Sequence, residues 1–392
     1  MKHDLRYGGA LVGQSEINAI IKSIKKSQKT GNWQTATEAK KMEEESAKFL
    51  GVKYGILTTS GSCAGLLALS ALELRKGEEV IISAVTFPTI FNIILQCGLV
   101  PVVVDAKIGT YNFDVDEVEQ AIIKSKGRVK CIIAVHAVGN PCDMPRLMKV
   151  AKKYNVKVIE DNCDGWGSTI QSRKVGSFGD ISITSFHAAH IVSMGVGGGI
   201  FTNNKTLAER VRVYRDWGRQ ANFNGTKNVK YRKLPRDYNP RFIYDKIGYN
   251  FQILELQASM GRVQLKKSDK IRRLRKANFN YLYENLTGFD DLILPKWDYE
   301  NADICWFSFP LTTKGDRGKL VAHLEKHGIE TRSMFAGNIL KHPAYKGVKA
   351  KQFGKLTEAN YILEHSFWMT CHPRLTKENL EYIIKVFKDY YA

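Results

Sequence analysis

The chain has 392 residues, of which 44% are hydrophobic, and a formal net charge of +20. It is long enough to bury a large core, as two domains or one large domain with a small companion, and no run of 18 apolar residues predicts a membrane-spanning helix. The charge indicates an anionic ligand or a lysine-rich surface rather than nucleic-acid binding, since no zinc-finger spacing, RNP-like aromatic pair or basic region before heptads accompanies it.

The seven cysteines are scattered, are odd in number and form no C-x-x-C pair. This pattern argues against a disulfide framework and against a zinc or thioredoxin-like site, so we expect no metal ion. The opening stretch, MKHDLRYGGALVG, lacks the apolar segment of a signal peptide. We therefore expect a cytoplasmic location.

In the first two-thirds of the chain, short apolar runs typical of buried strands alternate with helical patterns. The predicted strands are 54–60, 78–85, 100–106, 129–137, 156–162 and 179–187. The helical patterns between them include 63–74 and 144–154. This alternation predicts an α/β domain whose mostly parallel sheet is covered by helices on both faces.

A long helical pattern over 254–286 leads into a second unit with strand and helix patterns of its own. We predict a large domain over 1–259 and a small C-terminal α/β domain over 260–392. In open parallel sheets, ligands bind at the carboxyl ends of the strands. Polar residues at those ends are therefore the first candidates for a site.

The stretch TTSGSCAG places Gly61 and Ser62 between a predicted strand and a predicted helix. Free N–H groups and the helix dipole make such a turn a natural phosphate cradle, although many strand–helix turns of this composition bind nothing. Asp161 ends another strand, where a carboxylate caps a helix or pairs with a protonated pyridine nitrogen. Phe87 leaves a third strand and either packs in the core or stacks on a flat ring.

A further candidate stretch, SFHAAHIVSMGVGGG, covers 185–199. Ser185 offers a hydroxyl to a phosphate, and His190 is a candidate general base because imidazole exchanges protons near neutral pH. The glycines of this stretch suit a close backbone approach or a positive φ. No lysine occurs from Val175 to Asn204.

In this order, the stretches resemble the sugar aminotransferase family of the DegT/DnrJ/EryC/StrS type, which has the fold of aspartate aminotransferase (fold type I) and uses pyridoxal phosphate. The resemblance runs from about Gly13 to the C-terminus and includes VHAVGNPCDM, IEDNCDGWGS, GSFGDISITSF, GYNFQILELQAS and ETRSMFAGN. It implies a three-layer α/β/α large domain with a small C-terminal domain. It also implies a homodimer with shared active sites.

The resemblance assigns roles to matching residues. The implied cofactor-binding residues are Gly61, Ser62, Cys63, Phe87, Asp161, Asp164, Ser185 and Asn250. The phosphate turn and Ser185 would hold the phosphate, Phe87 would stack on the ring, and the two aspartates would meet the ring nitrogen and hydroxyl. Asn250 would reach the phosphate of a neighbouring subunit. The implied substrate-binding residues are Arg219, Arg332 and Asn338.

His190 departs from the family pattern, because ordinary members have a lysine there, within SFHxxK. That lysine forms a Schiff base with the cofactor and moves protons during transamination, whereas a histidine can only move protons. The subset of the family with this histidine consists of 3-dehydratases of nucleotide-linked 4-keto-6-deoxy sugars, which use free pyridoxamine phosphate. The resemblance implies that His190 is the catalytic base that removes a cofactor proton, so that the C3 hydroxyl of the sugar is expelled.

One kind of these dehydratases carries a [2Fe–2S] cluster on cysteines spaced C-x57-C-x1-C-x7-C. Cys163 matches the first position, but Ala221, Phe223 and Tyr231 occupy the other three, so four-thiolate ligation fails. The other kind has no cluster and regenerates pyridoxamine phosphate from L-glutamate. Val196 also replaces a glutamate that is common in the glycine run of the family.

We therefore predict a cluster-free 3-dehydratase that converts a GDP- or CDP-linked 4-keto-6-deoxy sugar into a 3,6-dideoxy sugar, with pyridoxamine phosphate regenerated from L-glutamate. Such sugars belong to lipopolysaccharide or capsule biosynthesis. Two alternatives stay open: a related enzyme that needs an external electron donor, and a catalytically idle relative that binds a nucleotide sugar. We expect neither nucleic acid nor a membrane as a partner.

Overall fold

The computed structural model describes residues 5–219, 234–235 and 238–392. Among these residues, the larger sheet has eight strands in the order β1–β9–β8–β5–β4–β2–β3–β13. In that order, their bounds are Tyr54–Thr58, Gly198–Thr202, Ile181–Ser185, Lys157–Asp161, Val129–Val135, Glu79–Ser83, Val100–Val104 and Lys351–Gln352. Neighbouring strands are parallel except around β9, which runs antiparallel to both β8 and β1.

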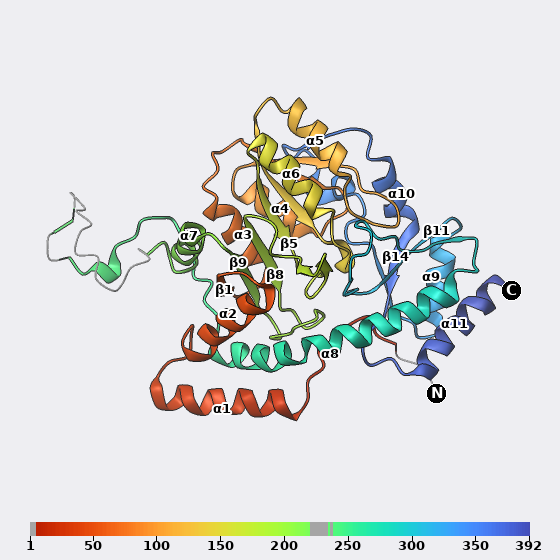
Figure 1. Cartoon of the computed structure of the whole chain (residues 1–392), viewed down its shortest axis with the longest axis horizontal. Coiled ribbons are helices and arrows are strands. Elements are labelled where there is room, and N and C mark those ends of the chain that lie inside the picture. Colours follow the sequence, from red (N-terminus) through yellow and green to blue (C-terminus); the bar gives the residue numbers. More distant parts are fainter. Residues whose placement is uncertain (1–4, 220–233, 236–237) are drawn as a thin grey trace.

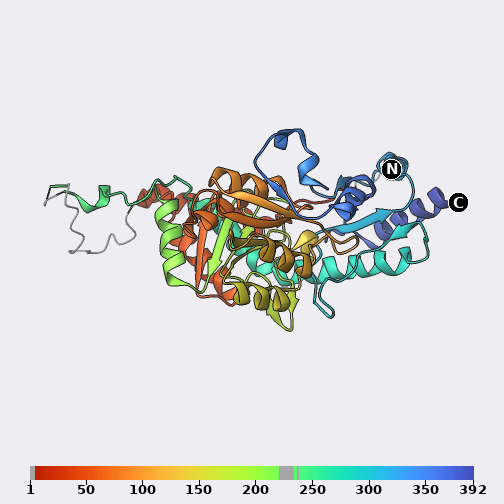
Figure 2. The same cartoon turned by 90° about the horizontal axis from the view of Figure 1, so that it is seen from above.

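Helices cover this sheet on both faces, so the large unit has three layers (Figures 1 and 2). They are α3 (Gly61–Ala71), α4 (Pro88–Gln96), α5 (Val115–Lys124), α6 (Met144–Tyr154) and α7 (Lys205–Arg215). Every residue of β2 and β3 is buried, which explains why these strands are continuous apolar runs. The six predicted strands are confirmed as β1, β2, β3, β4, β5 and β8, and so is the mostly parallel α/β sheet.

Two strands of the sheet lie outside the predicted set. β13 consists of two exposed polar residues and has no apolar pattern. β9 passes so close to the turn after β1 that a Cβ on Gly198 would lie 2.2 Å from the Ser60 carbonyl oxygen. Gly195, before β9, has a φ of 74°. The glycine run therefore supplies both the close approach and the positive φ that the sequence suggested.

The smaller sheet is antiparallel and has the order β10 (Leu292–Ile293), β11 (Phe309–Thr313), β14 (Ser366–Met369), β12 (Thr331–Ser333). The helices in this part of the chain are α9 (Arg317–Lys326), α10 (Thr357–His365) and α11 (Lys377–Tyr391). The predicted long helix is α8, Glu255–Leu286. It crosses the predicted domain boundary at 259/260, and β13 joins the later part of the chain to the larger sheet, so that boundary stays a prediction.

The remaining elements are short. They are the hairpin of β6 (Thr169–Ile170) and β7 (Arg173–Lys174) and the 3-10 turns Ala137–Gly139, Pro240–Phe242, Ile339–Lys341 and Pro343–Tyr345. Of the helices formed by described residues, none is long and apolar enough to cross a membrane.

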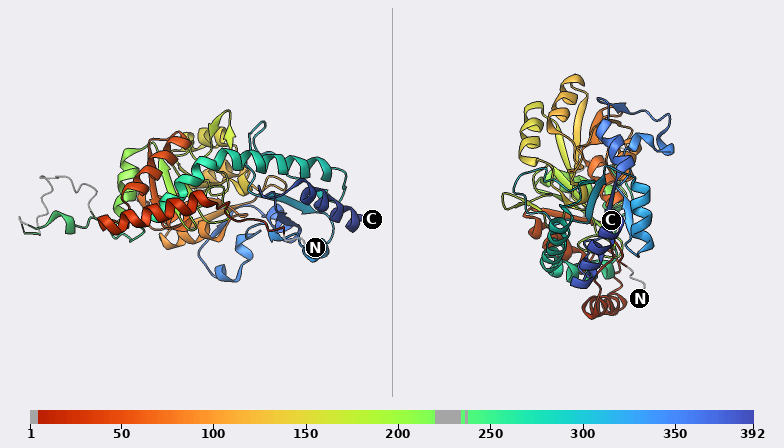
Figure 3. Two further views of the ribbon diagram at one scale, coloured as in Figure 1. Left: turned by 90° about the horizontal axis from the view of Figure 1, so that it is seen from below. Right: turned by 90° about the vertical axis from the view of Figure 1, so that its right-hand side faces the viewer.

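Two helices that precede the first strand, α1 (Gln14–Thr30) and α2 (Thr37–Leu50), pack on α8 (Figure 3). The carboxylate of Glu255, the first residue of α8, accepts the N–H groups of Ala36, Glu38 and Ala39. It thereby satisfies backbone groups that the start of α2 leaves free. This contact fixes the start of α2 against the start of α8.

Glu16 anchors α1 on α8 and is fully buried. Its carboxylate accepts hydrogen bonds from Lys267 Nζ at 2.6 and 2.8 Å, from Gln264 Nε2 at 2.7 Å and from the Gly13 N–H at 2.9 Å. Burial alone would raise the pKa of this carboxyl, but the bonds from Lys267, Gly13 and Gln264 outweigh burial and lower the pKa to about 2. The charged form of Glu16 therefore stabilises the packing of α1.

We expect Glu16→Gln to lower the free energy of unfolding by about 1–3 kcal/mol at pH 7, because the amide leaves Lys267 without its charged partner. The folded-state pKa lies below the unfolded value near 4.5, so this stability is present above pH 4.5 and is lost as the pH falls toward 2. Urea unfolding at pH 7 and pH 3 measures the difference. Glu44→Gln, at an exposed position of α2, is the control, and an equal cost at both pH values would contradict the assignment.

Candidate active site

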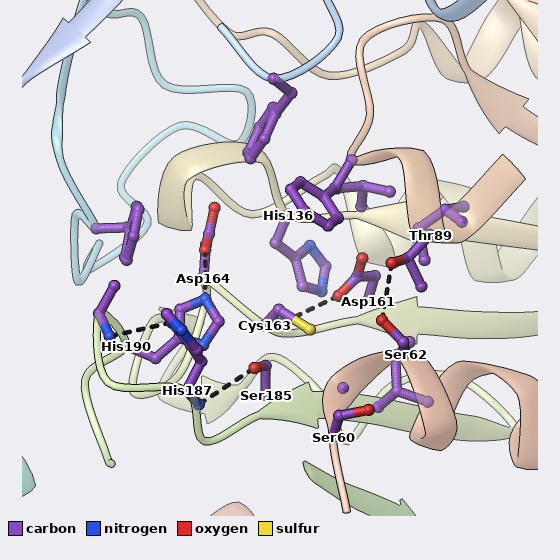
Figure 4. Close-up of a pocket in the computed structure, with 18 of the residues that line it drawn as sticks. Ser60, Ser62, Thr89, His136, Asp161, Cys163, Asp164, Ser185, His187 and His190 are labelled. Atoms are coloured by element: carbon purple, nitrogen blue, oxygen red, sulfur yellow. Dashed lines mark hydrogen bonds and ion pairs between the residues drawn. The ribbon is translucent and has the colours of Figure 1, made fainter. Parts of the chain in front are cut away.

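A cavity of about 400 Å³ opens where the strands of the larger sheet end (Figure 4). Seven residues expected from the sequence line it: Gly61, Ser62, Phe87, Asp161, Asp164, Ser185 and His190. Asp161 and Ser185 are the last residues of β5 and β8, and Gly61 opens α3 shortly after β1. The parallel strands thus bring together side chains that lie far apart in the chain.

One end of the cavity is built around the N-terminus of α3. Ser60 caps this helix through its side chain, and the hydroxyls of Ser62 and Thr89 lie 2.9 Å apart. A Cβ on Gly61 would lie 2.8 Å from the Ser185 Cβ, so glycine alone permits this approach. Backbone N–H groups, the helix dipole and several hydroxyls therefore face one small space, which suits a phosphate.

Asp161 is 6% exposed, and its Oδ1 accepts the N–H of Cys163 at 3.1 Å. Burial raises the pKa of this carboxyl, and the hydrogen bonds from Cys163 act in the opposite direction. A buried carboxylate that accepts so few hydrogen bonds is stabilised most by a cationic N–H partner. Its place at the end of β5 suits the protonated nitrogen of an aromatic ring.

His136 lines the cavity near Asp161, and the sequence did not single it out. The Cys142 N–H lies 3.2 Å from its Nδ1, and Glu160 Oε2 lies 3.1 Å from its Nε2. Because a backbone N–H only donates, Nδ1 is the acceptor and Nε2 donates to Glu160. His136 is a polar residue near the end of the predicted strand 129–137, in VHAVGNPCDM, and this position is the signal that could have identified it.

His190 lies in the loop after β8, with Nε2 3.4 Å from Asp164 Oδ1 (Figure 4). Within the described part of the chain, its Nδ1 is buried and has no hydrogen-bond partner, and its ring centroid lies 5.4 Å from that of Phe307. Nε2 is therefore the nitrogen that can exchange a proton in the cavity, and Asp164 is placed to stabilise the imidazolium form. No lysine or arginine of the described residues lines the cavity.

Five residues expected at the site do not line this cavity: Cys63, Arg219, Asn250, Arg332 and Asn338. Asn338 is buried, and its side chain is bonded to Asn360 and to the N–H of Leu340. The Arg219 guanidinium lies over the rings of Trp217, Phe242 and Tyr244. Asn250 is exposed. The roles of all five stay predictions.

Several lining residues carried no sequence signal that separates them from core residues: Tyr7, Phe307, Phe335 and Trp368. Arg332 meets this group, since its guanidinium carbon lies 4.4 Å from the centroid of the Tyr7 ring. Val196 also lines the cavity, is 51% exposed, and accepts a hydrogen bond on its carbonyl from Gln257 Nε2. Val196, at the position where the family commonly has a glutamate, therefore adds an apolar side chain to the cavity wall.

Cys163, the first position of the cluster spacing, lines the cavity, where burial and the nearby Asp161 carboxylate raise the pKa of its thiol well above the usual range. Ala221, Phe223 and Tyr231 lie outside the described residues. The described ranges contain no group of three or more His, Cys, Asp or Glu side chains placed to hold a metal ion. The expectation that the protein has no cluster therefore still rests on the sequence.

The chain is similar to proteins of sugar metabolism. It is 36% identical to the lipopolysaccharide biosynthesis protein RfbH of Salmonella typhimurium, over 98% of this chain and 91% of that protein. It is 35% identical to dTDP-4-dehydro-2,6-dideoxy-D-glucose 3-dehydratase of Saccharopolyspora spinosa, over 90% of this chain and 80% of that protein.

Similar solved structures include a crystal structure of GDP-4-keto-6-deoxymannose-3-dehydratase with a trapped PLP–glutamate geminal diamine. It has a TM-score of 0.88 and 26% identity and covers 97% of this chain and 99% of that chain. The predicted aminotransferase fold is thereby confirmed. Since the model of one protein family matches residues 14–388, nearly the whole length, the chain belongs to the DegT/DnrJ/EryC1/StrS aminotransferase family.

Proposed function

We propose that the protein is a pyridoxamine-phosphate-dependent 3-dehydratase of a GDP- or CDP-linked 4-keto-6-deoxy sugar, with L-glutamate as the amino donor that regenerates the cofactor. The observation that carries this proposal is His190, which stands where the family has its Schiff-base lysine, in a cavity that no described lysine lines. An aminotransferase needs that amine to carry the cofactor. A histidine can act as a base but cannot form a Schiff base, so it suits an elimination reaction instead.

Some of the similar proteins support the same reaction. Family membership alone does not separate the two activities, because the family is named for aminotransferases. However, two of the similar proteins are 3-dehydratases of nucleotide-linked deoxy sugars, and one of them was solved with an adduct of pyridoxal phosphate and glutamate. Glutamate, the proposed amino donor, is therefore found bound to the cofactor in a protein of this fold.

The residues present fit the cofactor. Gly61 at the start of α3, Ser62 and Ser185 would hold its phosphate, Asp161 would bind the pyridine nitrogen, and Phe87, which is 57% exposed, would offer its ring face. When bound, pyridoxamine phosphate supplies an amine that condenses with a ketone and a ring that accepts an electron pair. Asp161 favours the protonated ring nitrogen because its own charge is buried.

Proton transfer falls to His190. Its Nε2 takes up and returns a proton in both half-reactions, and the Asp164 carboxylate at 3.4 Å stabilises the charged ring. The Phe307 ring packs against the imidazole in a tilted arrangement, with the ring centroids 5.4 Å apart. Asp164 therefore has a second role beside the contact with the ring hydroxyl that the resemblance implies.

We also propose that the enzyme works as a cytoplasmic homodimer without an iron–sulfur cluster. Asn250 is exposed and does not line the cavity of its own chain, which suits a residue that completes the site of a neighbouring subunit. Arg219 lies three residues after Asp216, which forms a β-bridge with Asn250, and would be supplied in the same way. Arg332, by contrast, would act at the cavity of its own chain, because its guanidinium lies over the ring of Tyr7.

Purified protein incubated with pyridoxal phosphate and L-glutamate should form pyridoxamine phosphate and 2-oxoglutarate, which absorbance spectra and a coupled 2-oxoglutarate assay detect. His190→Asn should slow this half-reaction at least about 100-fold, since it removes the general base. His327→Asn, which does not line the cavity, is the matched control. A parent protein that leaves both compounds unchanged would rule out the glutamate cycle.

His190→Lys should restore covalent attachment of the cofactor while suppressing dehydration. After borohydride reduction, mass spectrometry should find pyridoxal phosphate linked to this variant and not to the parent or to His190→Asn, because only an amine forms the Schiff base. Product masses from 4-keto-6-deoxy sugars linked to GDP, CDP and dTDP report dehydration. If the variant dehydrates as fast as the parent, His190 does not decide the reaction.

Anaerobically purified protein should contain no stoichiometric iron or acid-labile sulfide, and added iron and sulfide should not change its rate. The reason is the lack of three of the four thiolates that the cluster spacing requires. Iron and sulfide analysis together with electron paramagnetic resonance tests this. Two iron atoms per chain would favour the alternative that needs an external electron donor.

A further inference from the structure

Residues 5–10 form an extended strap that joins the smaller sheet to the cavity. Leu5 forms a parallel bridge with Ile329, through backbone hydrogen bonds of 2.9 and 3.1 Å with Gly328 and Glu330. Farther along the strap, the carbonyl of Gly9 lies 2.8 Å from Nε2 of the buried His372. The strap is therefore held at both ends, and the residue between these anchors that lines the cavity is Tyr7.

The position of Tyr7 is set by Glu330 and Arg332. One oxygen of the Glu330 carboxylate accepts the Tyr7 N–H at 2.9 Å, and the other accepts Arg332 Nη2 at 2.5 Å. The guanidinium carbon of Arg332 in turn lies 4.4 Å from the centroid of the Tyr7 ring, within cation–π range. These three contacts among Tyr7, Glu330 and Arg332 orient the Tyr7 ring. None of the described residues forms a hydrogen bond with the Tyr7 hydroxyl.

The strap also lies against the loop that carries the catalytic base. A Cβ on Gly8 would lie 3.2 Å from the Cβ of Ala189, the residue before His190. Tyr7 is thus fixed relative to His190 as well as to the smaller sheet. A ligand that touches the Tyr7 ring is therefore held at a defined distance from the proton-exchanging nitrogen.

Tyr7 belongs to an aromatic wall that differs from the rest of the cavity. Its other members are Phe307, Phe335 and Trp368, which come from the later part of the chain, whereas the hydroxyls and carboxylates follow strands of the larger sheet. Phe335 has a φ of 46°, which is rare for so large a residue, and its ring lies 4.9 Å from that of Trp368. Backbone strain of this kind is typical of a residue held in place for binding.

We propose that Tyr7 is a substrate-binding residue that holds the sugar ring of the nucleotide-linked substrate. The C–H groups of a pyranose are apolar and carry slight positive charge, so they pack well on the negative face of an aromatic ring. The hydroxyl of Tyr7 is available to bond to a sugar oxygen, and the guanidinium of Arg332, which lies over the ring, offers a positive charge to the diphosphate. This inference rests on the proposed function.

Calorimetric titration of the cofactor-free protein tests the contact without any turnover. The probes are 4-keto-6-deoxy sugars linked to GDP, CDP and dTDP. Tyr7→Ala should weaken the tightest of them at least about tenfold, which corresponds to about 1.4 kcal/mol. Tyr7→Phe keeps the ring, so a loss of less than about threefold assigns the contact to the ring, and a loss equal to that of Tyr7→Ala assigns it to the hydroxyl. In the loaded enzyme, Tyr7→Ala should raise KM for the sugar more than it lowers kcat.

Tyr154→Ala is the matched control, because Tyr154 is also half-buried, has Lys153 over its ring at 4.9 Å, and does not line the cavity. Thermal melting verifies that all variants fold. A loss of less than twofold in Tyr7→Ala, or a parent that binds none of the three sugars, overturns the inference. A parent that binds sugar through Tyr7 but makes no pyridoxamine phosphate from L-glutamate keeps the inference and loses the proposed function.

Discussion

The contact between Gly61 and Ser185 sets the shape of the cavity. A side chain at residue 61 would overlap Ser185, since its Cβ would lie 2.8 Å from the Ser185 Cβ, so α3 and the end of β8 meet only through glycine. A second close approach also requires glycine, because Gly198 of β9 lies against the Ser60 carbonyl. These two approaches determine where the start of α3 lies relative to Asp161 and to the loop of His190.

The charge of the protein and the charge of its cavity have opposite signs. The chain carries a net +20, yet the described residues that line the cavity include two aspartates and no lysine or arginine. A phosphate in this cavity would therefore be held by backbone N–H groups and hydroxyls at the start of α3, and the field of the whole surface would attract it. Such a cavity would offer hydrogen-bond donors to an anion, and its described lining has no amine that would react with a carbonyl group.

The parts of the site that follow strands could be predicted, because a buried parallel strand has an apolar run that is easy to recognise. Asp161 and Ser185 end such runs, and both line the cavity. Tyr7 could not be predicted, because backbone bridges and the side chains of Glu330 and Arg332 place it, and neither leaves a periodic pattern. β13 could not be predicted either, because its two residues are exposed and polar and leave no apolar pattern.

The exchange of lysine for histidine has consequences beyond the loss of an amine. The Nδ1 of His190 is buried and finds no partner among the described residues, so a proton on Nδ1 would be unsatisfied, at a cost of about 1–3 kcal/mol. The neutral ring therefore favours a proton on Nε2, directed at Asp164 3.4 Å away. In the proposed reaction, Nε2 would become a base only after that proton moves toward Asp164 or the ring changes tautomer. His190 and Asp164 would then act as one proton-exchanging unit.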